Sequence, residues 1–132
     1  MAGYSTTPLS QKLGIKEGHL IAVLGAPAGW IIPELPAGVV VRDRARGPLD
    51  VIVAFFSDRA SVCRRLPTLR SALRRDGSLW IAWPRRAAGH SSDISEGDLR
   101  EMILPSGLVD IKVAALDPDW SGLKFVWRRE LR

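Results

Sequence analysis

Residues 49–84 read LDVIVAFFSDRASVCRRLPTLRSALRRDGSLWIAWP, and this stretch decides the fold class. Its beginning, residues 49–56, is almost continuously apolar, the pattern of a strand covered on both faces of a parallel sheet. A second apolar run, residues 78–83, predicts the next strand. Between them, residues 59–75 carry apolar side chains at helical spacing, which predicts an amphipathic helix. This order predicts a right-handed crossover between two parallel strands.

Two residues bear on how this helix runs. Pro67 lies inside it, so that either the helix is kinked there or a short turn precedes a second helix that begins near Pro67. Gly77 is expected to end the helix, because glycine just beyond the last turn is a common stop signal.

The residues before this unit predict two short strands. Residues 19–24 are apolar and run into the turn formers GAPAG at 25–29, and residues 39–41 are three valines. The apolar residues WII before Pro33 favour one or two helical turns, although the proline limits their length. The first 17 residues hold few apolar side chains, and we expect 1–17 to form an arm on the body of the protein.

The residues after 84 predict a helix and a hairpin. Ser95 and Asp98 have the spacing of a capping box, which opens a helix. Residues 109–115 and 123–127 alternate between apolar and other side chains and are joined by DPDWSG, which predicts an antiparallel hairpin at a sheet edge.

Together these elements predict one α/β sheet. We expect segments 50–56, 78–83 and 108–116 to be parallel neighbours, with 123–129 antiparallel at or near the edge. Edge strands with apolar side chains invite pairing, so a homodimer through the last strand or the short second strand is expected as one possible assembly.

Length and composition indicate a single globular domain, residues 1–132. Apolar residues make up 46% and charged residues 25%, which excludes general disorder and fibrous repeats. No run approaches the roughly 18 apolar residues of a spanning helix, and the start lacks a signal-peptide centre. We therefore expect a cytoplasmic protein with no membrane partner. A single cysteine, Cys63, excludes an internal disulfide and predicts a buried, inert thiol.

The net charge is +5, from 15 Arg and 4 Lys against 14 acidic residues. This balance suggests an anionic partner such as nucleic acid. However, the arginine pairs are scattered and have no aromatic residues between them, so a solvated surface is the favoured interpretation and nucleic acid is not the expected partner.

The run PLDVIVAFFSDRASVCRRLPTLRSALRRDGSLWIAWPRR, residues 48–86, resembles the central part of class I methyltransferases. The resemblance implies a Rossmann-like α/β fold, with a mostly parallel sheet of the class I methyltransferase type and a C-terminal antiparallel hairpin, reduced in size.

The chain also resembles a narrower group of short bacterial proteins, a domain of unknown function that looks like a shortened methyltransferase. Four segments carry this resemblance: YSTTPLSQKLGIKEGH (4–19), GAPAGW (25–30), LWIAWPRR (79–86) and GLVDIKVAALDPDWSGLKFVWRRE (107–130). It implies the fold and leaves the function open.

The methyltransferase resemblance implies where S-adenosylmethionine would bind. The cofactor would lie against Gly25 and Gly29 in the first turn, with Asp43 on the ribose hydroxyls and Asp58 nearby. Pro27 removes a backbone donor from this turn and fixes its own φ. We therefore expect the turn not to hold S-adenosylmethionine tightly.

Other candidate residues should gather at the carboxyl ends of the strands, where open parallel sheets bind ligands. Arg85 or Arg86 is the candidate for binding an anionic group. Asp93 or Asp117 is the candidate for orienting that arginine. The candidates for stacking on a flat group are Trp83, Trp30 and Trp120. Trp120 is the leading candidate, and we expect it to be partly exposed, in contact with the loop after Trp83 and lining the main crevice.

Other chemistries have weak support. His90 and Asp93 do not make a zinc site without further ligands, and Ser61 and Ser121 lack a nucleophile elbow. The leading hypothesis is a degenerate, non-catalytic module that binds a small ligand or a protein. The alternatives are an active S-adenosylmethionine-dependent methyltransferase and a nucleic-acid accessory protein.

Overall fold

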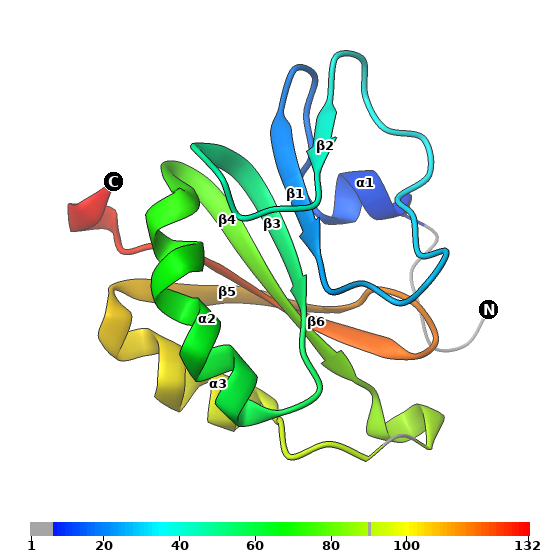
Figure 1. Ribbon diagram of the computed structural model, residues 1–132, viewed down its shortest axis with the longest axis vertical. Coiled ribbons are helices and arrows are strands. Elements are labelled where there is room, and N and C mark those ends of the chain that lie inside the picture. Colours follow the sequence, from blue (N-terminus) through cyan, green and yellow to red (C-terminus); the bar gives the residue numbers. More distant parts are fainter. Residues whose placement is uncertain (1–6, 90) are drawn as a thin grey trace.

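The fold is a six-stranded sheet with helices on one face (Figure 1). The computed structural model describes residues 7–89 and 91–132. In this part of the chain the strands are β1 (Leu20–Leu24), β2 (Val40–Arg42), β3 (Leu49–Phe55), β4 (Leu73–Pro84), β5 (Leu108–Ala115) and β6 (Trp120–Trp127). The helices are α1 (Leu9–Lys12), α2 (Arg59–Ala72) and α3 (Glu96–Ile103), with short 3-10 turns at Arg86–Ala88, Leu104–Ser106 and Arg129–Leu131.

The strand order is β2-β1-β3-β4-β6-β5. The expected parallel pairing of the two central strands is confirmed, with Val53 opposite Trp80. The third expected neighbour is wrong: β5 runs in the same direction as β4 but lies at the edge, because β6 returns between them and pairs antiparallel with both. The last strand, β6, is paired on both sides, so of the two strands named for a homodimer only β2 lies at an edge of the sheet in the described residues.

The crossover from β3 to β4 differs from expectation at its end. Asp58 caps α2, and the helix continues without a break through Pro67 to Ala72. Gly77 does not stop the helix but lies buried within β4, which begins directly at Leu73. Residues 74–76 bulge out of the pairing with β3, and a Cβ on Gly77 would lie 2.9 Å from the carbonyl oxygen of Asp50. The close approach of β3 therefore requires glycine at this position.

The two faces of the sheet are covered differently. On the face that we call the helical face, α2 and α3 pack their apolar side chains onto the sheet (Figure 1). The Ser95–Asp98 capping box that starts α3 is present as expected. The opposite face, the arm face, is covered by residues 9–15 and by the connection 25–39.

The connection between β1 and β2 contains no helix, so the helical turns expected near Trp30 are wrong. Glu34 adopts a φ of 56° between Pro33 and Pro36, and this backbone is incompatible with a regular helix. The segment still covers the sheet, because Ile32 is buried and Trp30 and Leu35 pack on the same core. No helix in the described residues is long and apolar enough to cross a membrane.

We predict that Gly77→Ala lowers the free energy of unfolding by about 1–3 kcal/mol, because the added methyl group must displace the backbone of β3. Urea unfolding measures this change. Gly97→Ala is the matched control: its Cβ would meet no atom closer than 3.9 Å, and in α3 the substitution should stabilise by up to about 1 kcal/mol. Equal stability of Gly77→Ala and the unsubstituted protein would contradict the close approach.

Candidate functional site

A crevice lies at the carboxyl ends of β1 and β2. It consists of two adjoining hollows that share Val23, Trp30 and Val41. The smaller, of about 300 Å³, is apolar and is completed by Ile31, Ile32 and Leu35. The larger, of about 740 Å³, is more polar and is completed by Gly25, Ala26, Arg42 and Asp43. This is the position at which open parallel sheets bind ligands.

The turn after β1 places one of the two expected glycines in the site. Gly25 has a φ of +69°, and a Cβ there would lie 3.0 Å from the carbonyl oxygen of Phe55, so this position requires glycine. Gly29 also has a positive φ, but it is exposed and lines neither hollow. Residues 25–39 form no helix, so no helix begins in the connection that follows β1.

Trp30 forms the shared wall of the two hollows and is fixed from the hairpin between β5 and β6. Its indole Nε1 donates a hydrogen bond of 2.9 Å to Asp117 Oδ2. Its ring meets Phe55 edge to face, at 4.7 Å between centroids. The other oxygen of Asp117 accepts the backbone N–H groups of Asp119 and Trp120. Asp117 therefore shapes the hairpin and orients Trp30, and it does not line the crevice itself.

Asp43 lies at the opposite side of the larger hollow, directly after β2. Its carboxylate is exposed and has no hydrogen-bond or ion-pair partner among residues 7–89 and 91–132. The neighbouring Arg42 donates to the carbonyl oxygen of Arg46, 2.8 Å away. The site therefore joins an apolar wall to one unpartnered carboxylate.

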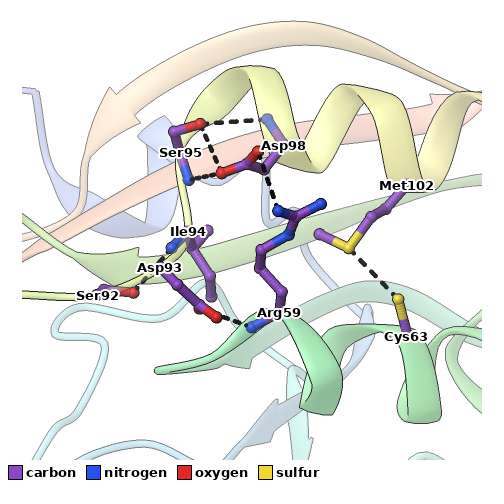
Figure 2. A network of polar contacts seen from close by, with 8 residues as sticks. All are labelled: Arg59, Cys63, Ser92, Asp93, Ile94, Ser95, Asp98 and Met102. Carbon is purple, nitrogen blue, oxygen red and sulfur yellow. Dashed lines mark hydrogen bonds and ion pairs between the residues drawn. The ribbon is translucent and has the colours of Figure 1, made fainter.

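Two other expected carboxylates, those of Asp58 and Asp93, hold the fold together, and Figure 2 shows the second of them. Asp58 accepts the backbone N–H and the hydroxyl of Ser61, and these hydrogen bonds hold the pKa of its carboxyl below the usual value. Asp93 accepts the backbone N–H of Arg59, the first residue of α2, over 2.9 Å. Neither lines the crevice, and the placement of Asp58 beside a cofactor stays a prediction.

The loop after β4 forms a site separate from the crevice. Trp83 is 8% exposed and belongs to the core of the helical face, so its expected role as a stacking surface is corrected. The Arg85 guanidinium donates to the carbonyl oxygen of Pro118, and its backbone N–H donates to Asp119. Arg86 is exposed in the following 3-10 turn.

Trp120 is partly exposed and lies opposite Pro84, beside the loop after Trp83, as expected. It is the first residue of β6 and not part of a longer connection, and its ring packs on Phe55 at 5.0 Å. It lines neither hollow. Its contact with the crevice is indirect, because Phe55 packs against both Trp120 and Trp30.

Cys63 is exposed, which corrects the expectation of a buried thiol, and its sulfur lies 3.4 Å from the sulfur of Met102 (Figure 2). No group of three or more metal-ligating side chains occurs within the described part of the chain. His90, half of the disfavoured zinc pair, lies outside the described residues.

Sequence reasoning missed the apolar wall of the site. Val23, Val41 and Ile32 belong to segments that were interpreted only as strands or helical turns. The signal was present in the cluster of apolar residues after the GAPAG turn, which is too rich in large side chains for a solvent-exposed loop.

No family model and no curated protein matches this chain by sequence. Its structure resembles that of a SAM-dependent methyltransferase from Aquifex aeolicus, with a TM-score of 0.60 and 15% identity over 87% of this chain and 85% of that chain. It also resembles the fibrillarin of Aeropyrum pernix with bound S-adenosyl-L-methionine, with a TM-score of 0.53 and 20% identity over 89% and 73% of the two chains. These likenesses show that the fold is of the class I methyltransferase type.

We predict that Asp117→Ala lowers the free energy of unfolding by about 2 kcal/mol, because three N–H groups lose their common acceptor. The indole N–H signal of Trp30 in ¹H–¹⁵N NMR spectra should move in the same variant. Asp43→Ala is the control, and its stability should stay within about 0.5 kcal/mol of the unsubstituted protein. An unmoved Trp30 signal in Asp117→Ala would show that this hydrogen bond does not orient the ring.

We predict that Trp120→Ala lowers the free energy of unfolding less than the replacement of a fully buried tryptophan does. We expect a loss of about 1–3 kcal/mol, below the roughly 3–5 kcal/mol typical of a core tryptophan, because the ring is partly exposed. Trp80→Ala, at a side chain that is 0% exposed, serves as the comparison in the same urea titration. If Trp120→Ala is unfolded, Trp120 is a structural residue of the core and the prediction is wrong.

Proposed function

We propose that this chain is a non-catalytic, methyltransferase-like binding module whose site is the crevice at the carboxyl ends of β1 and β2. Its ligand is a small molecule with a flat apolar group and a hydroxyl-bearing part. The observation that carries the proposal is the unpartnered carboxylate of Asp43 in the hollow that adjoins the apolar wall of Val23, Trp30 and Val41.

The chemistry of the two hollows supports this ligand class. Small-molecule sites are concave, mostly apolar and equipped with a few polar groups that orient the ligand. Trp30 is held in place by Asp117, so the apolar wall is formed before any ligand arrives. An exposed carboxylate accepts hydrogen bonds from hydroxyl groups. Adenosine has a flat base and ribose hydroxyls and is therefore a suitable probe.

The crevice fits S-adenosylmethionine only in part. Its nucleoside portion matches the apolar wall and Asp43. The amino-acid portion would need backbone donors or a helix N-terminus for its carboxylate. Pro27 has no N–H, and no helix follows the turn after β1. The residues present therefore support nucleoside binding and not tight binding of the whole cofactor.

The other carboxylates at this end of the sheet support a binding role over catalysis. Asp58, Asp93 and Asp117 each accept backbone N–H groups. A general base must be free to accept a proton from the substrate. These three groups are instead committed to a helix cap, a helix start and a turn.

The second candidate is an active S-adenosylmethionine-dependent methyltransferase. One observation favours it: Gly25 and Asp43, two of the residues that the methyltransferase resemblance places around the cofactor, line the same hollow. Tight binding of the whole cofactor is the result that separates this candidate from a nucleoside-binding module.

Calorimetric titration distinguishes the two. We expect adenosine and S-adenosylmethionine to bind within about threefold of each other, with Kd values above about 0.1 mM, because the amino-acid portion gains no contacts. Asp43→Asn should weaken adenosine binding about tenfold, the effect of losing one charged hydrogen bond.

Asp76→Asn is the matched control, since Asp76 is an exposed carboxylate in the bulge of β4 and lines neither hollow of the crevice. An equal loss in this variant would remove Asp43 from the site. Micromolar, saturable binding of S-adenosylmethionine would contradict the binding-module proposal and favour an active methyltransferase. Absence of adenosine binding would exclude the proposed ligand class.

A further inference from the structure

The protein has only 4 lysines among 19 basic residues, and all four gather in one place on the arm face. Lys12 ends α1, and Lys16 follows it by four positions. Lys112 lies in β5 and Lys124 in β6, and their ammonium groups lie on the arm face, near Lys12 and the Trp80 ring respectively. Segments more than 80 residues apart in the chain, around residues 12–16 and 112–124, thus contribute to one cluster.

Strand pairing and hydrogen bonds bring the lysines close to one another. Lys112 and Lys124 are paired in register on neighbouring antiparallel strands, where two like charges destabilise a sheet. Lys12 Nζ donates to the carbonyl oxygen of Ala115 over 3.0 Å, and Lys112 Nζ donates to that of Lys12 over 3.4 Å. Partial burial, and then the charges of Lys112 and Lys16, lower the pKa of the Lys124 ammonium.

Lys124 has no anionic partner in the part of the chain that the structure describes. Its Nζ lies 6.0 Å from the centroid of the Trp80 ring, and a Cβ on Gly14 would lie 3.4 Å from it. None of the four lysines forms an ion pair with a carboxylate within the described residues. The nearby Asp110 of β5 is bound to Arg100 of α3, on the helical face.

A few of the arginines differ from the lysines in this respect. Arg59, Arg74 and Arg100 each lie within ion-pair distance of an aspartate. The fold therefore neutralises charge at these arginines and leaves the lysines uncompensated. A repulsive cluster of this kind lowers stability unless a ligand supplies the opposite charge.

We propose that Lys12, Lys16, Lys112 and Lys124 form a binding site for a small ligand with a diphosphate or triphosphate group. Lysine presents a compact point charge that suits phosphate oxygens. Several phosphoryl groups are needed to offset the charge of four ammonium groups. The site is independent of the crevice, since none of the four lysines lines either hollow.

The test is calorimetric titration of the full chain with inorganic triphosphate at about 0.15 M salt, where long-range attraction is screened. We expect saturable 1:1 binding that Lys112→Gln and Lys124→Gln each weaken about tenfold. Arg86→Gln and Arg129→Gln are matched controls: each removes the same charge at an exposed position, and each should leave the affinity within about twofold.

A second readout guards against loss of structure. Because Lys124→Gln removes like-charge repulsion, this variant should be at least as stable as the unsubstituted protein in urea without ligand. Triphosphate at one fixed concentration should raise the unfolding midpoint of the unsubstituted protein more than that of Lys124→Gln.

Three outcomes would overturn the proposal. No saturable binding of triphosphate up to millimolar concentration would exclude the site. An equal loss of triphosphate affinity in Arg86→Gln and Lys124→Gln would show that binding depends on the net charge of the protein and not on the lysine cluster. Tighter binding of a DNA duplex, with the same loss in all four variants, would assign the charge to a diffuse nucleic-acid surface instead.

Discussion

The central strand β3 buries side chains on both faces of the sheet, so both faces must be covered, and the two longer helices cover only one of them. α2 and α3 cover the helical face. On the arm face, the segment 9–15, which includes the one-turn helix α1, and the connection 25–39 form the cover. The buried indole of Trp80 links sheet and arm, because its Nε1 donates to the carbonyl oxygen of Leu13 over 3.1 Å.

This way of covering the arm face generates both candidate sites. The connection 25–39 brings Trp30 over Phe55 and leaves an apolar crevice beside Asp43. The arm carries Lys12 and Lys16 to the lysines of β5 and β6.

The parts of the fold that local sequence patterns determine could be predicted. The apolar runs of β3 and β4, the spacing in α2 and the capping box of α3 are of this kind. The prediction that Gly77 ends the helix was wrong, because glycine is required there by the close backbone of β3 and not by a helix end.

Features that depend on contacts between distant segments could not be read from the sequence. The insertion of β6 between β4 and β5 is one example. At the site, Gly25 and Asp43 were expected because of the resemblance to class I methyltransferases. The use of Asp93 and Asp117 as acceptors for distant N–H groups and the gathering of the lysines depend on folding partners 34 or more residues away.

The most direct test of this account is ¹H–¹⁵N NMR mapping of a saturating adenosine titration. The account predicts concerted shifts at the backbone signals of Gly25, Val41 and Asp43 and at the indole of Trp30, with little change at Arg85 and Arg86. Shifts centred on the loop after β4, with the crevice signals unmoved, would contradict it and place the ligand site at the other strand ends.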